Sequence, residues 1–193
     1  MESDLLFAAK NAGYVHIDSL VQLETWGRKK LGREVSLRIN EGIGTGHHRH
    51  VVTGGPDSKF GIYYTDLPKA LALAKKYGLR ITGLQQHIGS NILDTKTFIK
   101  AMGLILQTAQ SFPNLESIDI GGGLGIPYRP EAKPLNLQKL GKAIAVTFKK
   151  FCKKYGRELE LGLEPGRYIG AESGAHLVKV VDRKETPKHS FVG

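Results

Sequence analysis

Short apolar runs alternate with longer amphipathic stretches along most of this chain of 193 residues. The runs that we predict to be strands cover residues 14–18, 34–40, 80–87, 115–120 and 158–163. The stretches that we predict to be helices cover residues 19–30, 66–77, 94–111 and 137–155. This alternation predicts βαβ units and a parallel sheet, either open and doubly wound or closed as a (β/α)8 barrel.

The number of these units limits which parallel fold the chain can form. A complete barrel usually takes about 250 residues, whereas about five βα units are expected here. A barrel interpretation therefore requires a partial barrel. After residue 172 the alternation stops, and we expect a further strand over 175–181 and a polar loop over 182–190 that leaves the sheet.

The net charge of +10, from 28 basic and 18 acidic residues, could attract nucleic acid, an anionic membrane or a phosphorylated ligand. Most lysine clusters lie on predicted amphipathic helices without interleaved aromatic residues, so solvated helix faces are the favoured interpretation. No RNA-binding or helix-turn-helix signature is present. We therefore expect no nucleic-acid partner.

Neither a membrane segment nor a secretory signal is expected. No apolar run approaches the roughly 20 residues of a membrane span, and the chain opens with acidic residues. The single cysteine, Cys152, excludes an internal disulfide and a cysteine-rich metal site. These features favour a cytoplasmic protein without a membrane partner.

Three candidate functional motifs follow predicted strands, where parallel α/β proteins place their chemistry. The first contains His87, Gly89 and Ser90. The His87 ring would lie at the rim of the sheet, Gly89 would let the backbone approach a ligand, and Ser90 would offer a hydroxyl group and an N–H. A hydrogen-bonded core histidine is an equal alternative for this motif taken alone.

The second motif is the run of Gly121, Gly122 and Gly123. Consecutive free backbone N–H groups after a strand could surround a phosphate. The run is not a Rossmann fingerprint, because Ile126 stands where a glycine is needed, and no Gly-Lys-Ser/Thr follows as in a P-loop. A glycine turn that requires positive φ is the alternative.

The third motif is Glu164-Pro165-Gly166-Arg167. Its carboxylate could face a cationic ring nitrogen, and its guanidinium could face a carboxylate or a phosphate. A turn with a surface ion pair is the alternative. Together the three motifs predict one site with a phosphate cradle, a stacking histidine and a carboxylate.

In their order, these motifs resemble those of the fold-type III pyridoxal-phosphate-dependent decarboxylases, which have alanine racemase-like barrels. The resemblance extends to residues 35–40, 53–62 and 122–128, and it covers nearly the whole chain. It implies that residues 1–172 form a partial (β/α)8 pyridoxal-phosphate-binding barrel. Residues 173–193 would lead into a C-terminal β-domain.

The resemblance also implies residue roles and a cofactor, pyridoxal 5'-phosphate, with no metal ion. The catalytic candidates are His87, which would lie against the pyridoxal ring, and Glu164, whose carboxylate would face the pyridine nitrogen and keep it protonated. Electrons left by departing carbon dioxide could then flow into the ring. Arg167 would also meet a substrate carboxylate. The remaining cofactor-binding candidates are Gly89, Ser90, Gly121, Gly122, Gly123, Pro165, Gly166 and Arg167.

The chain departs from the family at two positions. No segment matches the strand that carries the Schiff-base lysine, and Lys10 lies too close to residues 13–19 to be that residue, so we predict a helix lysine. No C-terminal Cys-Glu motif is found, and Cys152 lies in a predicted helix. We therefore expect a fragment that lacks both ends, is inactive alone and exposes unpaired strand edges.

The cluster of His47, His48 and His50 could suggest a metal site. Because neighbouring loop residues rarely converge on one ion and Arg49 opposes a cation, a polar active-site rim is favoured. The resemblance assigns no role to residues 57–59.

The resemblance is strongest to members that decarboxylate meso-2,6-diaminopimelate to L-lysine, as homodimers acting on a small amino acid. Two alternatives stay open. One is a decarboxylase of ornithine, arginine or carboxynorspermidine. The other is a non-catalytic module that binds pyridoxal phosphate without a Schiff-base lysine.

Overall fold

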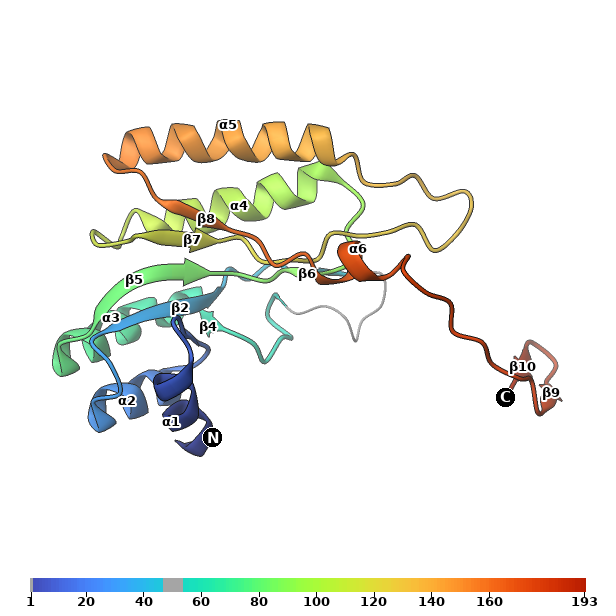
Figure 1. Ribbon diagram of the computed structural model, residues 1–193, viewed down its shortest axis with the longest axis horizontal. Coiled ribbons are helices and arrows are strands. Elements are labelled where there is room, and N and C mark those ends of the chain that lie inside the picture. The colour runs from blue at the N-terminus through green and yellow to red at the C-terminus, as the bar shows by residue number, and fades with distance from the viewer. Residues whose placement is uncertain (1, 47–53) are drawn as a thin grey trace.

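The computed structural model describes residues 2–46 and 54–193, and its centre is a parallel sheet (Figure 1). Five strands follow one another in chain order across this sheet. They are β1 (His16–Ile17), β2 (Glu34–Asn40), β5 (Arg80–Gln85), β7 (Ser117–Asp119) and β8 (Glu160–Gly162). All four pairings are parallel. This order is that of a barrel wall, since a doubly wound sheet reverses its strand order at a switch point.

Helices cover this sheet in two packed pairs. In Figure 1, α2 (Leu20–Lys29) and α3 (Leu67–Tyr77) lie along β2 and β5, and α4 (Thr95–Ala109) and α5 (Leu137–Tyr155) lie along β7 and β8. The remaining elements are α1 (Glu2–Asn11), η2 (Tyr64–Asp66) and α6 (Gly166–Gly170), with the short strands β3 (Thr45–Gly46), β4 (Ile62–Tyr63) and β6 (Gly89–Ser90). The predicted α/β class with a parallel sheet is confirmed.

One row of apolar side chains runs across all five strands. The register aligns Ile17, Leu37, Leu84, Ile118 and Leu161 on neighbouring strands. The first four are completely buried. Because side chains alternate between the two faces of a strand, the rows on either side of this one point to the opposite face. The apolar row belongs to the core, and the opposite face carries polar residues.

The helices present apolar residues to this core at helical spacing. In α5 the buried residues are Leu140, Ile144, Phe148 and Phe151, at intervals of four and three. This spacing places them on one face of the helix. The hydroxyl of Ser19 accepts a hydrogen bond from the Gln22 N–H at 3.2 Å and caps α2, as predicted.

The predicted bounds 34–40 and 137–155 agree with β2 and α5, whereas the other main strands are shorter than predicted. Lys10 lies in the last turn of α1, so the prediction of a helix lysine is confirmed.

The C-terminal segment differs from its prediction. No strand forms over residues 175–181, although their composition favours one. Their apolar side chains are largely exposed, with Leu177 at 92% and Val181 at 77%. Instead, the segment expected to be a polar loop contributes β9 (Arg183–Glu185), which pairs antiparallel with β10 (Ser190–Val192). A strand needs a partner for its backbone groups, and a hairpin supplies one locally.

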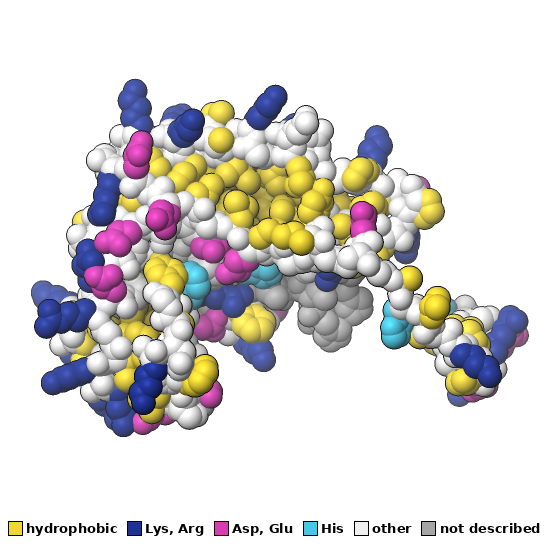
Figure 2. Space-filling view, viewed as in Figure 1, with side chains coloured by type: hydrophobic (Ala, Val, Ile, Leu, Met, Phe, Trp, Pro, Cys, Tyr) yellow, Lys and Arg dark blue, Asp and Glu magenta, His cyan; other side chains and the backbone are white. Residues whose placement is uncertain are grey.

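The chain leaves both edges of the sheet uncovered by any described strand. Within the described residues, β1 pairs only with β2, and β8 pairs only with β7. Figure 2 shows apolar side chains gathered between α5 and the sheet on this face, and residues 173–193 extend away from it (Figure 1). Among the described residues, no helix is both long and apolar enough to cross a membrane.

Candidate active site

The polar face of the sheet places several chemistry-bearing side chains together. Arg38, Gln85 and Asp119 are aligned on β2, β5 and β7, one position beyond the apolar row. His16 and Ser36 are aligned one position before it. His16 Nδ1 and Ser36 Oγ are hydrogen-bonded at 2.8 Å. Arg38, Gln85 and Asp119 lie toward the carboxyl ends of their strands, where the site is predicted.

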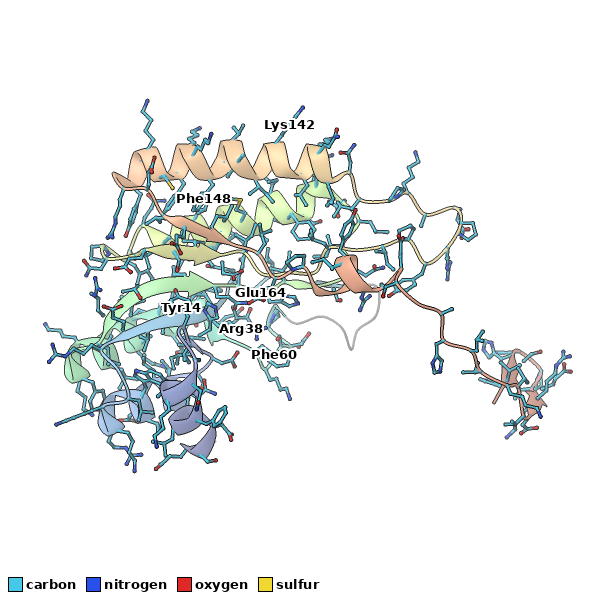
Figure 3. The ribbon with its side chains drawn as sticks, viewed as in Figure 1. Tyr14, Arg38, Phe60, Lys142, Phe148 and Glu164 are labelled. Carbon is cyan, nitrogen blue, oxygen red and sulfur yellow. The ribbon has the colours of Figure 1, made fainter. Side chains whose placement is uncertain are left out.

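A cavity of about 350 Å³ lies at this end of the sheet. Its lining consists of His16, Asp18, Arg38, Gln85, His87 and Glu164. Figure 3 shows that Glu164 and Arg38, from strand ends far apart in the sequence, approach the same region. The structure therefore brings together the two predicted catalytic residues, His87 and Glu164.

The carboxylate of Glu164 is hydrogen-bonded to a side chain at the end of β5. The Nε2 of Gln85 donates to Oε1 and Oε2 of Glu164 at 3.3 and 3.2 Å. Gln85 is only 4% exposed, whereas Glu164 is exposed at the mouth of the cavity. The glutamine thus restrains an accessible carboxylate.

A second carboxylate, Asp119, lies close to Glu164. Donor atoms of His16, Asp119 and Glu164 all lie within 4.8 Å of one another, which is within reach of a single cation. Clusters of this kind are also common without any ion. Burial raises the pKa of Asp119, the N–H of Gly121 opposes this by a hydrogen bond of 2.6 Å, and the nearby Glu164 raises it further.

Both histidines of the cavity favour their neutral forms. Burial lowers the pKa of His87, and Arg38 adds to this while Asp119 opposes it. Burial also lowers the pKa of His16, against the opposing effects of Asp119 and Glu164.

The glycine run joins three strand ends at close range. A Cβ on Gly121 would overlap the carbonyl oxygen of Gln86, and one on Gly122 would overlap that of Glu164. A Cβ on Gly123 would overlap the carbonyl oxygen of Gly89. The run is therefore needed so that the segments carrying His87 and Glu164 can pack against it.

The expectation that all three glycine N–H groups are free is wrong. The Gly121 N–H donates to Asp119 Oδ1, and the Gly122 N–H donates to His87 Nδ1 at 3.2 Å. The side chains supplying these acceptors could not be recognised before the strand ends were in register. Of the three N–H groups, only that of Gly123 has no hydrogen-bond acceptor among the described residues. Cofactor binding by the run stays a prediction.

The other predicted cofactor residues surround this run. Gly89 and Ser90 form β6, which pairs with β3. Pro165 precedes α6, and Gly166 and Arg167 are its first residues. The Arg167 guanidinium carbon lies 5.7 Å from the ring centroid of Tyr128. Their contacts with a cofactor stay predictions.

Sequence reasoning missed Arg38, Gln85, Asp119 and His16 as site residues. Arg38 lies 3.4 Å from Asp18 and 5.0 Å from the ring centroid of Phe60, so its guanidinium is held at the cavity (Figure 3). The alternation of polar and apolar residues, strict around Leu37 and Ile118 but broken after Leu84 by two successive glutamines, was the signal that could have revealed them.

The cluster of His47, His48 and His50 lies outside the described residues. Asp57, Ser58 and Lys59 do not line the cavity; Lys59 Nζ lies 5.4 Å from the ring centroid of Phe60. No lysine among the described residues lines it either.

The fold and the site define a class of protein: α/β-barrel proteins that gather a histidine, carboxylates and a glycine run beyond the carboxyl ends of their strands. The family model described as pyridoxal-dependent decarboxylase, pyridoxal binding domain, matches residues 3–171. The chain belongs to this family. The expected family and its pyridoxal cofactor are thereby confirmed.

Relatives and solved structures agree with this assignment. A diaminopimelate decarboxylase of Buchnera aphidicola (subsp. Acyrthosiphon pisum) is 38% identical, with 99% of this chain and 46% of the relative covered. One of Methanothermobacter thermautotrophicus is 35% identical, with 96% and 45% covered. The crystal structure of diaminopimelate decarboxylase from Helicobacter pylori complexed with L-lysine has a TM-score of 0.81 at 28% identity, covering 100% of this chain and 49% of that one. The chain therefore spans about half the length of the relatives it matches.

The residues present fit pyridoxal phosphate. A neutral histidine can lie against its ring, and an exposed carboxylate can accept from a protonated ring nitrogen. The buried Oε1 of Gln85 has no hydrogen-bond partner among the described residues, which marks this cavity as incompletely satisfied by protein groups.

Proposed function

We propose that this chain forms the cofactor-binding part of an enzyme that decarboxylates meso-2,6-diaminopimelate to L-lysine. The observation that carries the proposal is the convergence of His87 and Glu164 at one cavity, with the glycine run packed against the segments that carry them. The similarity to diaminopimelate decarboxylases along 99% of the chain supports the substrate. In the reaction, one carboxylate leaves as carbon dioxide and a proton takes its place.

Each site residue has a distinct task in this proposal. Pyridoxal phosphate, when bound, supplies an electron sink for the electrons left by carbon dioxide. His87 packs against one ring face and keeps water from it. Glu164 accepts a hydrogen bond from the protonated ring nitrogen. Gly89, Ser90, Gly123, Gly166 and their neighbours hold the phosphate, and Arg167 binds the phosphate or a substrate carboxylate.

A second candidate function is cofactor binding without catalysis. The observation that favours it is the absence of lysine from the lining of the described cavity. Borohydride reduction of the protein with pyridoxal phosphate, followed by peptide mass mapping, tests whether this chain itself supplies a Schiff-base lysine. Stoichiometric labelling of one lysine supports a complete catalytic site in this chain, and its absence supports binding alone or a lysine supplied by another segment.

The wider assignments follow from the same proposal. Residues 1–172 form the barrel part, and residues 173–193 begin a second, C-terminal domain. The working enzyme is a cytoplasmic homodimer whose partner is a small amino acid rather than nucleic acid. Ornithine, arginine and carboxynorspermidine are the alternative substrates.

Binding of reduced adducts tests the substrate without needing a lysine. Phosphopyridoxyl-diaminopimelate, prepared by reduction in solution, is compared with the ornithine and arginine adducts by calorimetry. We expect saturable binding of one molecule per chain, tightest for the diaminopimelate adduct. Preference for another adduct would assign that substrate instead, and no saturable binding of any adduct would contradict the proposed site.

A further inference from the structure

Gln85 is the described residue whose side chain is hydrogen-bonded to Glu164. It is the last residue of β5, and its Nε2 reaches both carboxylate oxygens across 79 positions of sequence. Burial of Gln85 in the sheet prevents its side chain from following the carboxylate into solvent. Glu164 lies beyond the end of β8 and is exposed, although its backbone N–H donates to the carbonyl oxygen of Gly121. The glutamine is therefore the more rigid partner of the pair.

The direction of this hydrogen bond has a chemical consequence. An amide nitrogen only donates, and an ionised carboxylate only accepts, with two lone pairs on each oxygen. Because both oxygens of Glu164 accept from the Gln85 amide, the contact suits an ionised carboxylate. It also restrains the orientation of the carboxylate plane. Each oxygen keeps an acceptor position for a donor in the cavity.

The charges around Glu164 explain why an uncharged donor suits this position. Asp119 and His16 lie within 4.8 Å of it at their donor atoms, and Arg38 lines the same cavity. A carboxylate at position 85 would add a third negative group. A lysine or arginine there would pair with Glu164 and compete with a cationic ligand. Glutamine orients the carboxylate without cancelling its charge.

We propose that Gln85 is a positioning residue that orients ionised Glu164 toward the protonated ring nitrogen of the cofactor. This inference rests on the proposed function, because that function gives Glu164 its role. It adds a residue that acts through Glu164 rather than by touching the cofactor.

The test compares pyridoxal phosphate with its 1-deaza analogue, in which a C–H replaces the ring nitrogen. The ratio of their dissociation constants measures the interaction at that nitrogen. The Gln85→Leu variant removes the donor, Gln86→Leu is the matched control at the neighbouring buried glutamine, and Gln85→His restores an N–H donor. Binding is measured by fluorescence, and denaturant unfolding verifies that each variant is folded.

We expect the wild-type chain to prefer pyridoxal phosphate and Gln85→Leu to lose about tenfold or more of that preference, as for one hydrogen bond to a charged group. Affinity for the deaza analogue should stay unchanged. Gln86→Leu should keep the preference, and Gln85→His should recover part of it.

Each contrary result would overturn a different part of the proposal. If the wild-type chain has no preference, the assignment of Glu164 in the proposed function is wrong, and the role of Gln85 falls with it. If the preference exists but Gln85→Leu retains it, only the role of Gln85 is overturned. An equal loss in Gln86→Leu would also overturn it, since the effect would then reflect packing.

Discussion

The backbone N–H of Gly122 donates to Nδ1 of His87 at 3.2 Å, joining two strand ends that lie 35 positions apart. This bond requires an unprotonated Nδ1 and therefore places the ring hydrogen on Nε2 of the neutral imidazole. The hydrogen bond therefore fixes the His87 ring relative to the backbone of the glycine run.

The first prediction concerns the tautomer of His87. We expect the Nε2–H tautomer to dominate above neutral pH, because Nδ1 is occupied as an acceptor. Side-chain ¹⁵N chemical shifts of the labelled chain measure this directly. The exposed His176 in the tail is the internal control and should show a mixture. A dominant Nδ1–H form of His87 would contradict the hydrogen bond.

The second prediction concerns stability against pH. The pKa values of His16 and His87 are lowered in the folded chain, so the unfolded chain binds more protons below about 6.5. The free energy of unfolding should therefore fall as pH drops from 7.5 to 5.5.

The Asp119 carboxyl group, also at this site, changes the free energy of unfolding with pH in the opposite direction. The pKa of Asp119 is raised, so its contribution decreases as pH rises above about 3.8, where the unfolded group ionises. Urea unfolding of a His16→Asn/His87→Asn double variant isolates the contribution of the two histidines to the pH dependence of the free energy of unfolding. This variant should lose less stability than wild type between pH 7.5 and 5.5, and an identical loss would refute the prediction.

The third prediction concerns the glycine run. Gly122→Ala forces a Cβ against the backbone of Glu164, so we expect destabilisation by about 1–3 kcal/mol. Gly141→Ala in α5 meets no atom within 4 Å and should instead stabilise by about 0.5–1 kcal/mol. Urea unfolding measures both. Equal effects of the two substitutions would show that the close approach between Gly122 and the backbone of Glu164 does not require a glycine.

The fourth prediction concerns Tyr155 at the end of α5. Its hydroxyl donates to the carbonyl oxygen of Phe112 and accepts from the Leu115 N–H at 3.0 Å. Tyr155→Phe should cost about 1–3 kcal/mol, because it leaves these backbone groups unpaired. The ring contact with Phe151, at 5.4 Å between centroids, is kept.

Tyr64→Phe provides the matched control, since Tyr64 is 46% exposed. We expect a change within about 0.5 kcal/mol for this surface substitution. Thermal unfolding of both variants compares them. If the two substitutions cost the same, the hydroxyl of Tyr155 does not anchor the segment between α4 and β7.

Local patterns were sufficient for much of the fold. β2 alternates apolar residues with Ser36 and Arg38, and α5 has an apolar face at helical spacing with Gly156 at its end, so both bounds were predictable. The strand over 175–181 was predicted wrongly, because apolar composition favours a strand only where a partner strand exists. Composition carries no information about that partner.

The sequence by itself determined the βαβ alternation, the family resemblance and the strand-end positions of His87 and Glu164, because these depend on residues close together in the chain. The tertiary structure decided which side chains accompany them. Gln85 meets Glu164, and Gly122 meets His87, only because parallel pairing sets the register of strands far apart in sequence. A shift of one residue would turn Gln85 to the opposite face of the sheet.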